Sequence, residues 1–189
     1  MNISDWYESD EIIEIIISFY SRAQAYKQTI LFLDGFSQRL IDEDGNYDKS
    51  LEICKQALNF SKMDKERDGF DGLQKLRQKI DVLQNFQEAK QCTITSPSIT
   101  REICNKVLSA NQQSIIINEG DYHSLMIYSY VHEERFEDAL EHITKMSQRG
   151  ILPKDFIEKD VLDRLENNLE KRQFPSENEN GDEISTEVR

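Results

Sequence analysis

Residues 136–146, FEDALEHITKM, repeat a short pattern that occurs at two other places in the 189-residue chain. In each copy an aromatic residue is followed by a small residue three positions later, an aliphatic residue beside it, and apolar residues at further steps of three. The copies comprise Tyr26, Thr29, Ile30, Leu33 and Phe36; Tyr47, Ser50, Leu51, Cys54 and Ala57; and Phe136, Ala139, Leu140, Ile143 and Met146. Steps of three and four residues place each set on one face of an α-helix.

This spacing also predicts how the helices pack. The small residue leaves room for a neighbouring helix to approach, and the aromatic residue fills the end of the gap. Two copies share the helix before the turn, because Tyr20 precedes Tyr26 at the same distance as Tyr130 precedes Phe136. The sequence therefore predicts helical hairpins with a turn of about four residues, the unit that is stacked in tetratricopeptide-type arrays.

The repeated pattern indicates the fold class and the kind of function. We predict an all-α protein in which antiparallel helical hairpins stack as a short tetratricopeptide-like α-solenoid. A weaker fourth copy begins at Phe86, where Lys90 takes the aliphatic position. Such units present surfaces to partners, so we expect no enzyme activity and no cofactor. The residues expected to pack between the repeats are Tyr20, Tyr26, Thr29, Tyr47, Ser50, Phe86, Tyr130, Phe136 and Ala139.

The composition favours a soluble, helix-rich chain. Hydrophobic residues make up 38% and charged residues 31%, whereas only seven glycines and three prolines are present. The net charge of −13 disfavours nucleic acids and anionic membrane surfaces, because both bind proteins largely through Lys and Arg. We therefore expect a basic protein partner, and neither nucleic-acid binding nor direct membrane insertion.

The cysteines and the first residues suggest the compartment. Cys54, Cys92 and Cys104 are odd in number and far apart, as is typical of free thiols in a reducing compartment. The first ten residues include acids and do not read as a leader peptide. The apolar run 12–20 is interrupted by Glu14 and is far shorter than the ~20 residues that cross a bilayer. We therefore expect an intracellular protein.

The expected domain organisation is one helical-repeat domain with an extension at each end. The domain covers residues 9–172, after an N-terminal arm of residues 1–8 and before a disordered acidic tail of residues 173–189. A linker is expected near residues 92–97. Four helices are expected at about residues 10–22, 26–41, 47–63 and 73–91, and further helices are expected to begin at Pro97 and at Pro153. Between these two, a helical hairpin is expected at residues 121–149. Gly120 is expected to end the segment before this hairpin.

Two stretches resemble metal motifs but depart from them. His132 begins a run like a helical zinc-protease motif, but Phe136 replaces the second histidine. The spacings of His132 from His123 and His142 do not bring three ligands together, so we expect surface or half-buried histidines. The acidic stretch 42–46 opens like a calcium loop, but its glycine is misplaced and Ile53 replaces the final Glu. We therefore expect a solvated turn there and no metal.

One hairpin allows a second functional interpretation. Residues 122–153, YHSLMIYSYVHEERFEDALEHITKMSQRGILP, resemble one pentatricopeptide repeat, a unit that reads one base of single-stranded RNA. The resemblance covers one repeat, and acidic residues crowd it. A pentatricopeptide-like RNA-binding protein therefore stays the alternative, together with a helical-repeat subunit of an unrelated assembly.

A longer resemblance extends over roughly residues 12–169. The segments IIISFYSRAQAYKQTILFLDGFSQ, NYDKSLEICKQAL, LQKLRQKIDVLQNFQEAKQ and GDYHSLMIYSYVHEERFEDALEHITKM follow one another in this order. In this order they resemble the C-terminal end of the family of 140-kilodalton subunits of intraflagellar transport complex A. Members of that family also carry two β-propellers, which this sequence lacks.

The resemblance implies a function and partners. It implies a non-enzymatic scaffold or adaptor that acts in retrograde ciliary transport and cilium assembly through protein–protein contacts. The implied partners are other subunits of the intraflagellar transport A complex, or upstream repeats of a longer parent chain. The implied location is the cilium, the basal body and the cytoplasm. A short array leaves its ends uncovered, so we also expect the apolar first helix to seek a partner.

Overall fold

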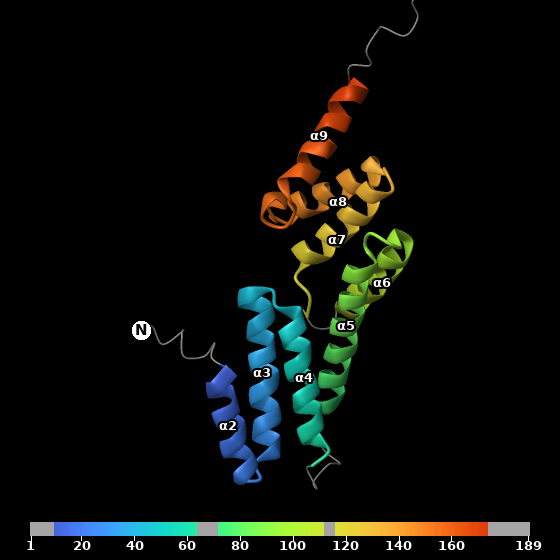
Figure 1. The fold of residues 1–189 in the computed structure, drawn as a ribbon. Coiled ribbons are helices and arrows are strands. Elements are labelled where there is room, and N and C mark those ends of the chain that lie inside the picture. Colours follow the sequence, from blue (N-terminus) through green and yellow to red (C-terminus); the bar gives the residue numbers. More distant parts are fainter. Residues whose placement is uncertain (1–9, 64–71, 112–115, 174–189) are drawn as a thin grey trace, which may run out of the picture.

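The computed structural model describes residues 10–63, 72–111 and 116–173 (Figure 1). The predicted arm 1–8 and nearly all of the predicted tail 173–189 lie outside these residues. Within the described part of the chain every regular element is helical, which confirms the all-α fold class. The elements are α2 (Asp10–Arg22), α3 (Tyr26–Asp44), α4 (Tyr47–Ser61), α5 (Gly72–Cys92), α6 (Pro97–Asn111), α7 (Glu119–His132), α8 (Phe136–Gln148), the 3-10 turn η2 (Pro153–Asp155) and α9 (Lys159–Gln173).

The helices form a stack in which neighbours in sequence are neighbours in space. Each helix from α2 to α7 packs against the next one, and η2 and α9 pack against the α7–α8 hairpin. Figure 1 shows α2, α3, α4 and α5 side by side in the lower part of the molecule, with α7, α8 and α9 above them. This arrangement confirms the predicted helical-repeat stack.

Helix α7 joins two hydrophobic cores. The larger core extends from α2 to the first half of α7, where it includes Tyr122, Leu125 and Met126. The smaller core extends from the second half of α7 to α9 and includes Ile127 and Val131. Because α7 is apolar on opposite sides, it is buried between both groups of helices.

Three turns of the stack share one backbone conformation. Gln24, Gly45 and Glu134 have φ angles of 54°, 60° and 59°, and each lies two residues before the aromatic residue of a pattern copy. In two of these turns the carbonyl oxygens of Tyr20 and Tyr130 accept 2.9 Å hydrogen bonds from the residue five positions later. The left-handed residue ends one helix and reverses the chain, so that the next helix runs back along it.

Two helix boundaries differ from the prediction because of glycines. Helix α3 continues to Asp44 rather than ending at Ile41, because Gly45 supplies the left-handed cap only after that residue. Gly120 was predicted to stop a segment, but it lies inside the first turn of α7. Its missing side chain makes room for the Phe156 ring, whose nearest atoms would lie 2.4 Å from an added Cβ atom.

The start of the last helix also differs from the prediction. Pro153 begins the 3-10 turn η2 instead of the last α-helix, and α9 begins at Lys159. The Tyr128 hydroxyl accepts a 3.0 Å hydrogen bond from the backbone N–H of Glu158, which fixes the chain just before α9. Proline suits the first residue of either kind of helix, so its presence does not distinguish them.

Candidate functional site

The small residue of each pattern copy is completely buried. Thr29, Ser50 and Ala139 have no exposed surface in α3, α4 and α8. The Thr29 hydroxyl donates a 3.1 Å hydrogen bond to the backbone carbonyl of Ala25, so its polar group is satisfied within its own helix. A larger side chain at any of the three positions would have to displace a neighbouring helix.

The aromatic residues of the pattern divide into two groups. Tyr47 and Phe86 are buried, and their rings meet edge to face between α4 and α5 with centroids 4.8 Å apart. The other four expected packing aromatics remain partly exposed, which differs from the expectation that all six lie between helices. They are Tyr20, Tyr26, Tyr130 and Phe136.

The surroundings of these four rings differ between the two ends of the described stack. Tyr20 and Tyr26 flank the first turn, where α2 and α3 form the end of the described stack. At the other end, arginine side chains cover the rings. Arg101 and Arg135 each lie 4.9 Å from the centroid of Tyr130, and Arg164 lies 5.5 Å from that of Phe136. Both rings also pack against the buried cores, so the cation–π contacts add to helix packing there.

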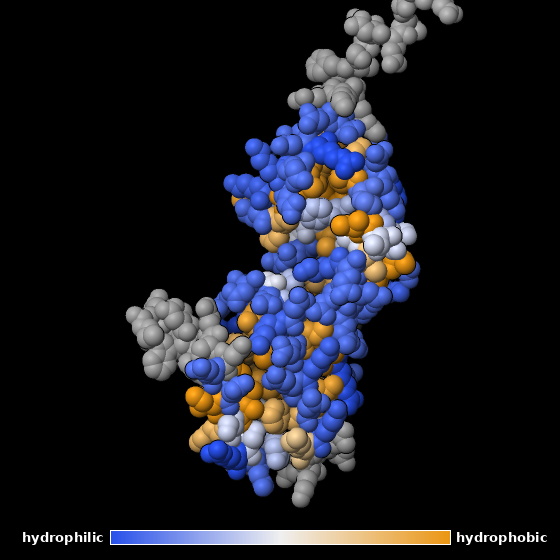
Figure 2. All heavy atoms as spheres, viewed as in Figure 1, coloured by the Kyte–Doolittle hydropathy of each residue, from blue (hydrophilic) through white to orange (hydrophobic). Residues whose placement is uncertain are grey.

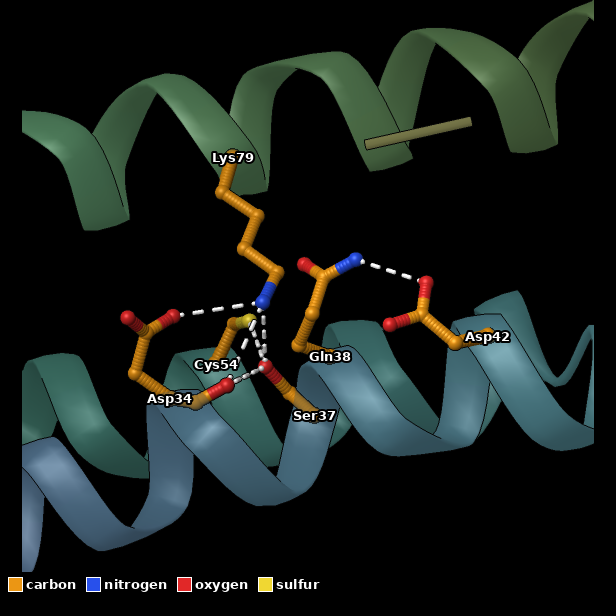
Figure 3. Close-up of polar contacts among 6 residues, drawn as sticks. All are labelled: Asp34, Ser37, Gln38, Asp42, Cys54 and Lys79. Atoms are coloured by element: carbon orange, nitrogen blue, oxygen red, sulfur yellow. Dashed lines mark hydrogen bonds and ion pairs between the residues drawn. The ribbon is translucent and has the colours of Figure 1, made fainter. Parts of the chain in front are cut away.

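A buried lysine connects the three helices α3, α4 and α5 (Figure 3). The Lys79 ammonium donates hydrogen bonds to the Ser37 hydroxyl at 2.7 Å and to the Asp34 carboxylate at 3.2 Å. Cys54 of α4 lies 3.3 Å from the same hydroxyl, measured from its sulfur. The side chain of Lys79 is 8% exposed and that of Asp34 46%, so the charge pair extends from the core to the surface.

The buried thiols are poor nucleophiles. Burial raises the pKa of Cys54 against the opposing influences of Ser37 and Lys79, and it raises the pKa of Cys104 to about 12. Both thiols are therefore protonated at neutral pH. The three cysteines are free, and Cys92 is only partly buried.

Two histidines form a buried pair between α7 and α8. His123 and His142 are 5% and 7% exposed, and their Nδ1 atoms lie 2.9 Å apart. The prediction of surface or half-buried histidines is therefore wrong for these two and holds for His132, which is exposed. Burial is the main cause that lowers the pKa of both, with a contribution from Arg149 at His123 and from His123 at His142. The pKa of His142 falls to about 4.

The sequence contained signals for both polar clusters. His123 precedes and His142 follows the turn at residues 133–135, so an antiparallel hairpin brings the two helix segments that carry them side by side. Lys79 stands between Leu76 and Leu83, at steps of three and four within the apolar stripe of α5. The spacing of the histidines excludes a shared metal site but is compatible with this pair.

A surface groove lies where the α5–α6 turn approaches α7 and α9. Its volume is about 450 Å³, and Leu125, Tyr128 and Val131 of α7 line it. Lys90 and Arg164 contribute basic groups to the lining. The lining therefore combines apolar side chains with polar and charged ones, among them His132 and Glu158.

The described residues contain neither a metal cluster nor a membrane span. Among residues 10–63, 72–111 and 116–173, no three His, Cys, Asp or Glu side chains are grouped so that they could hold a metal ion. No helix in this same part of the chain is long and apolar enough to cross a bilayer. The geometry thus offers surfaces, grooves and packing contacts.

A family model matches the part of the chain that carries these features. The model describes the C-terminal TPR domain of the 140-kilodalton intraflagellar transport subunit, and it matches residues 28–147, more than half of the chain. The match begins in α3 and ends in α8, and it therefore includes all three buried small residues and both polar clusters. It agrees with the resemblance that the order of the sequence segments indicated. The chain belongs to the family of this C-terminal TPR domain.

Proposed function

We propose that this chain is a non-catalytic scaffold that acts in retrograde ciliary transport and cilium assembly. The observation that carries the proposal is the family match over residues 28–147 of a stack whose helices pack on their sequence neighbours. Such a stack exposes a continuous surface that grows with each helix, which suits the docking of other proteins. The complete burial of Thr29, Ser50 and Ala139 supports close packing of its helices.

The proposed partners are other subunits of the intraflagellar transport A complex, in the cilium, at the basal body and in the cytoplasm. Two observations support a protein partner. The chain carries a net charge of −13, which repels nucleic acids and attracts basic surfaces. The groove beside α7 exposes apolar side chains of Leu125, Tyr128 and Val131 next to charged ones, a mixture that suits contact with another protein.

Affinity purification from ciliated cells tests this proposal. The tagged chain is expected to recover other subunits of the complex, and a variant with a disturbed stack is expected to lose them. Ala139→Leu places a larger side chain at a completely buried position of α8, whereas Thr144→Leu places the same side chain on its exposed face. Ala139→Leu should therefore lose the subunits and Thr144→Leu should retain them.

Two outcomes would contradict the proposal. If the unaltered chain recovers no transport subunit, the proposal that it is a scaffold of this complex is wrong. Enrichment of single-stranded RNA, confirmed by a mobility shift at low salt with the purified chain, would favour the pentatricopeptide-like alternative instead.

A further inference from the structure

Helix α2 exposes two large apolar side chains on its outer face, at the end of the described stack. Ile15 and Phe19 are 66% and 68% exposed, and Leu31 of the adjoining helix α3 is also exposed. Figure 2 shows hydrophobic side chains gathering over α2 and α3 at the lower left of the molecule. Large exposed apolar side chains that cluster on one face indicate an interaction surface.

The charges on this face have a particular order. Glu11, Ile15, Ser18 and Arg22 follow one another at steps of four, three and four, so they form a single line along α2, and all four are exposed. The acid lies near the beginning of the helix and the base at its end. An antiparallel copy of this line therefore places each charge opposite its complement.

We propose that α2 pairs with α2 of a second copy of this chain, antiparallel and about a two-fold axis. With the axis midway between residues 16 and 17, Glu11 faces the second copy's Arg22 and Ile15 faces its Ser18. The small Ser18 side chain allows the helices to approach, and Phe19 of each copy flanks the same side of the contact. A two-fold axis repeats every such contact.

The size of the surface limits the strength of this dimer. Helix α2 has 13 residues and is about 20 Å long, so one helix pair with part of α3 buries less area than a standard stable interface. The dimer is therefore expected to dissociate in the micromolar range. It does not depend on the proposed transport function, because it follows from the face of α2 alone.

Sedimentation equilibrium of the full chain measures the association. The average mass is expected to rise with concentration from that of one 22.2 kDa chain towards twice that value. Phe19→Asp should abolish the rise, because it places an acid in the contact. Ile94→Asp is the matched control, since Ile94 is 71% exposed but lies in the α5–α6 turn, and it should leave the dimer unchanged.

A charge exchange tests the antiparallel orientation. Arg22→Glu and Glu11→Arg should each weaken association by about tenfold, because each creates two repulsive pairs in the symmetric dimer. The double variant Glu11→Arg/Arg22→Glu should restore it. Lys55→Glu on the exposed face of α4 is the matched control for charge reversal. Circular dichroism confirms in each case that the helices are intact.

Three outcomes would overturn the inference. The first is a chain that stays monomeric at every concentration up to about ten times the expected dissociation constant. The second is a dimer that survives Phe19→Asp. The third is a dimer that both single charge reversals weaken and the double variant does not restore.

Discussion

Lys79 is a buried charged residue whose partner Asp34 lies partly at the surface. A buried charge pair loses hydration, and its attraction often does no more than offset that loss. Here the partner carboxylate of Asp34 is partly exposed and can be hydrated without the lysine. Ser37 also keeps a second bond, because its hydroxyl donates to the Asp34 carbonyl at 2.7 Å.

Substitution of Lys79 should therefore depend on volume more than on charge. Lys79→Met retains the length of the side chain, and we expect the free energy of unfolding to stay within about 1 kcal/mol of the unaltered chain. Lys79→Ala leaves a cavity between α3, α4 and α5 and should cost about 2–4 kcal/mol. Urea denaturation measures both values, and an equal loss in the two variants would contradict this account.

The histidine pair makes the α7–α8 hairpin sensitive to acid. The pKa of His142 is about 4 in the folded chain, below the ~6.5 of an unfolded histidine, so the unfolded state binds more protons between these values. The contribution of His142 to the free energy of unfolding is therefore fully present above about pH 6.5 and is lost as the pH falls towards 4. The decrease attributable to His142 is roughly 3 kcal/mol.

A comparison of two histidine variants isolates this effect. His142→Gln should flatten the dependence of the unfolding free energy on pH between 6.5 and 4, because the titrating ring is removed. His132→Gln, at an exposed position, should leave that dependence as steep as before. Thermal unfolding followed at several pH values measures both slopes, and two equal slopes would show that the pair does not cause the sensitivity.

At the scale of the elements, the glycine inside α3 and the glycine that caps it differ in backbone conformation. Gly35 lies on the exposed side of α3, and an added Cβ atom there would meet no other atom within 4 Å. Gly45 ends the same helix with φ +60°, a conformation that residues with a Cβ atom rarely adopt. An added Cβ atom has room at both positions, so only the backbone conformation distinguishes the two glycines.

Alanine at these two positions should change stability in opposite directions. Gly35→Ala should raise the free energy of unfolding by about 0.5–1 kcal/mol, because alanine favours the helix. Gly45→Ala should lower it by about 1–2 kcal/mol, because a left-handed alanine is strained. Differential scanning calorimetry compares the two melting temperatures, and a shift in the same direction would be inconsistent with the described turn.

The helices also show which boundaries can be predicted from the sequence and which cannot. The three-step pattern predicted α3, α4 and α8 within a few residues, because the small position is buried in all three. The predicted end of α3 at Ile41 is three residues too early, since the acids before Gly45 are compatible with either a helix or a turn. Gly120 could not be assigned correctly, because its partner Phe156 lies in a distant segment.

The candidate site was less accessible to prediction for a similar physical reason. Arg101 and Arg164, from other helices, cover the partly exposed rings of Tyr130 and Phe136, and no local pattern shows these contacts. The buried histidine pair depends on the register of two antiparallel helices. Local spacing thus determines which face of a helix is buried, whereas the contacts that complete that face come from elsewhere in the chain.

At the scale of the whole molecule, Tyr47 connects the lower helices with α7. Its hydroxyl donates a hydrogen bond to the Asp121 carboxylate and accepts one from the backbone N–H of Asn118 at 3.2 Å. Burial, together with the neighbouring Asp121, raises the pKa of Tyr47, so the hydroxyl stays protonated and able to donate. These bonds cross from α4 to the beginning of α7.

Tyr47→Phe should loosen this connection without emptying the core. The ring and its contact with Phe86 remain, and the loss of the hydroxyl should cost about 1–3 kcal/mol because Asp121 loses a charged hydrogen bond. Hydrogen exchange should increase most at the first turn of α7. Tyr26→Phe, at a partly exposed ring, should change neither quantity by a comparable amount.

The packing of each helix on its sequence neighbour also has a kinetic consequence. Contacts between segments close in the chain require little loop closure, so the hairpins should form rapidly, and each can form during synthesis as soon as it leaves the ribosome. The bond between Tyr47 and Asp121 is different, because it joins residues 74 positions apart. It can form only after both groups of helices exist, and it should therefore be among the last native contacts to appear.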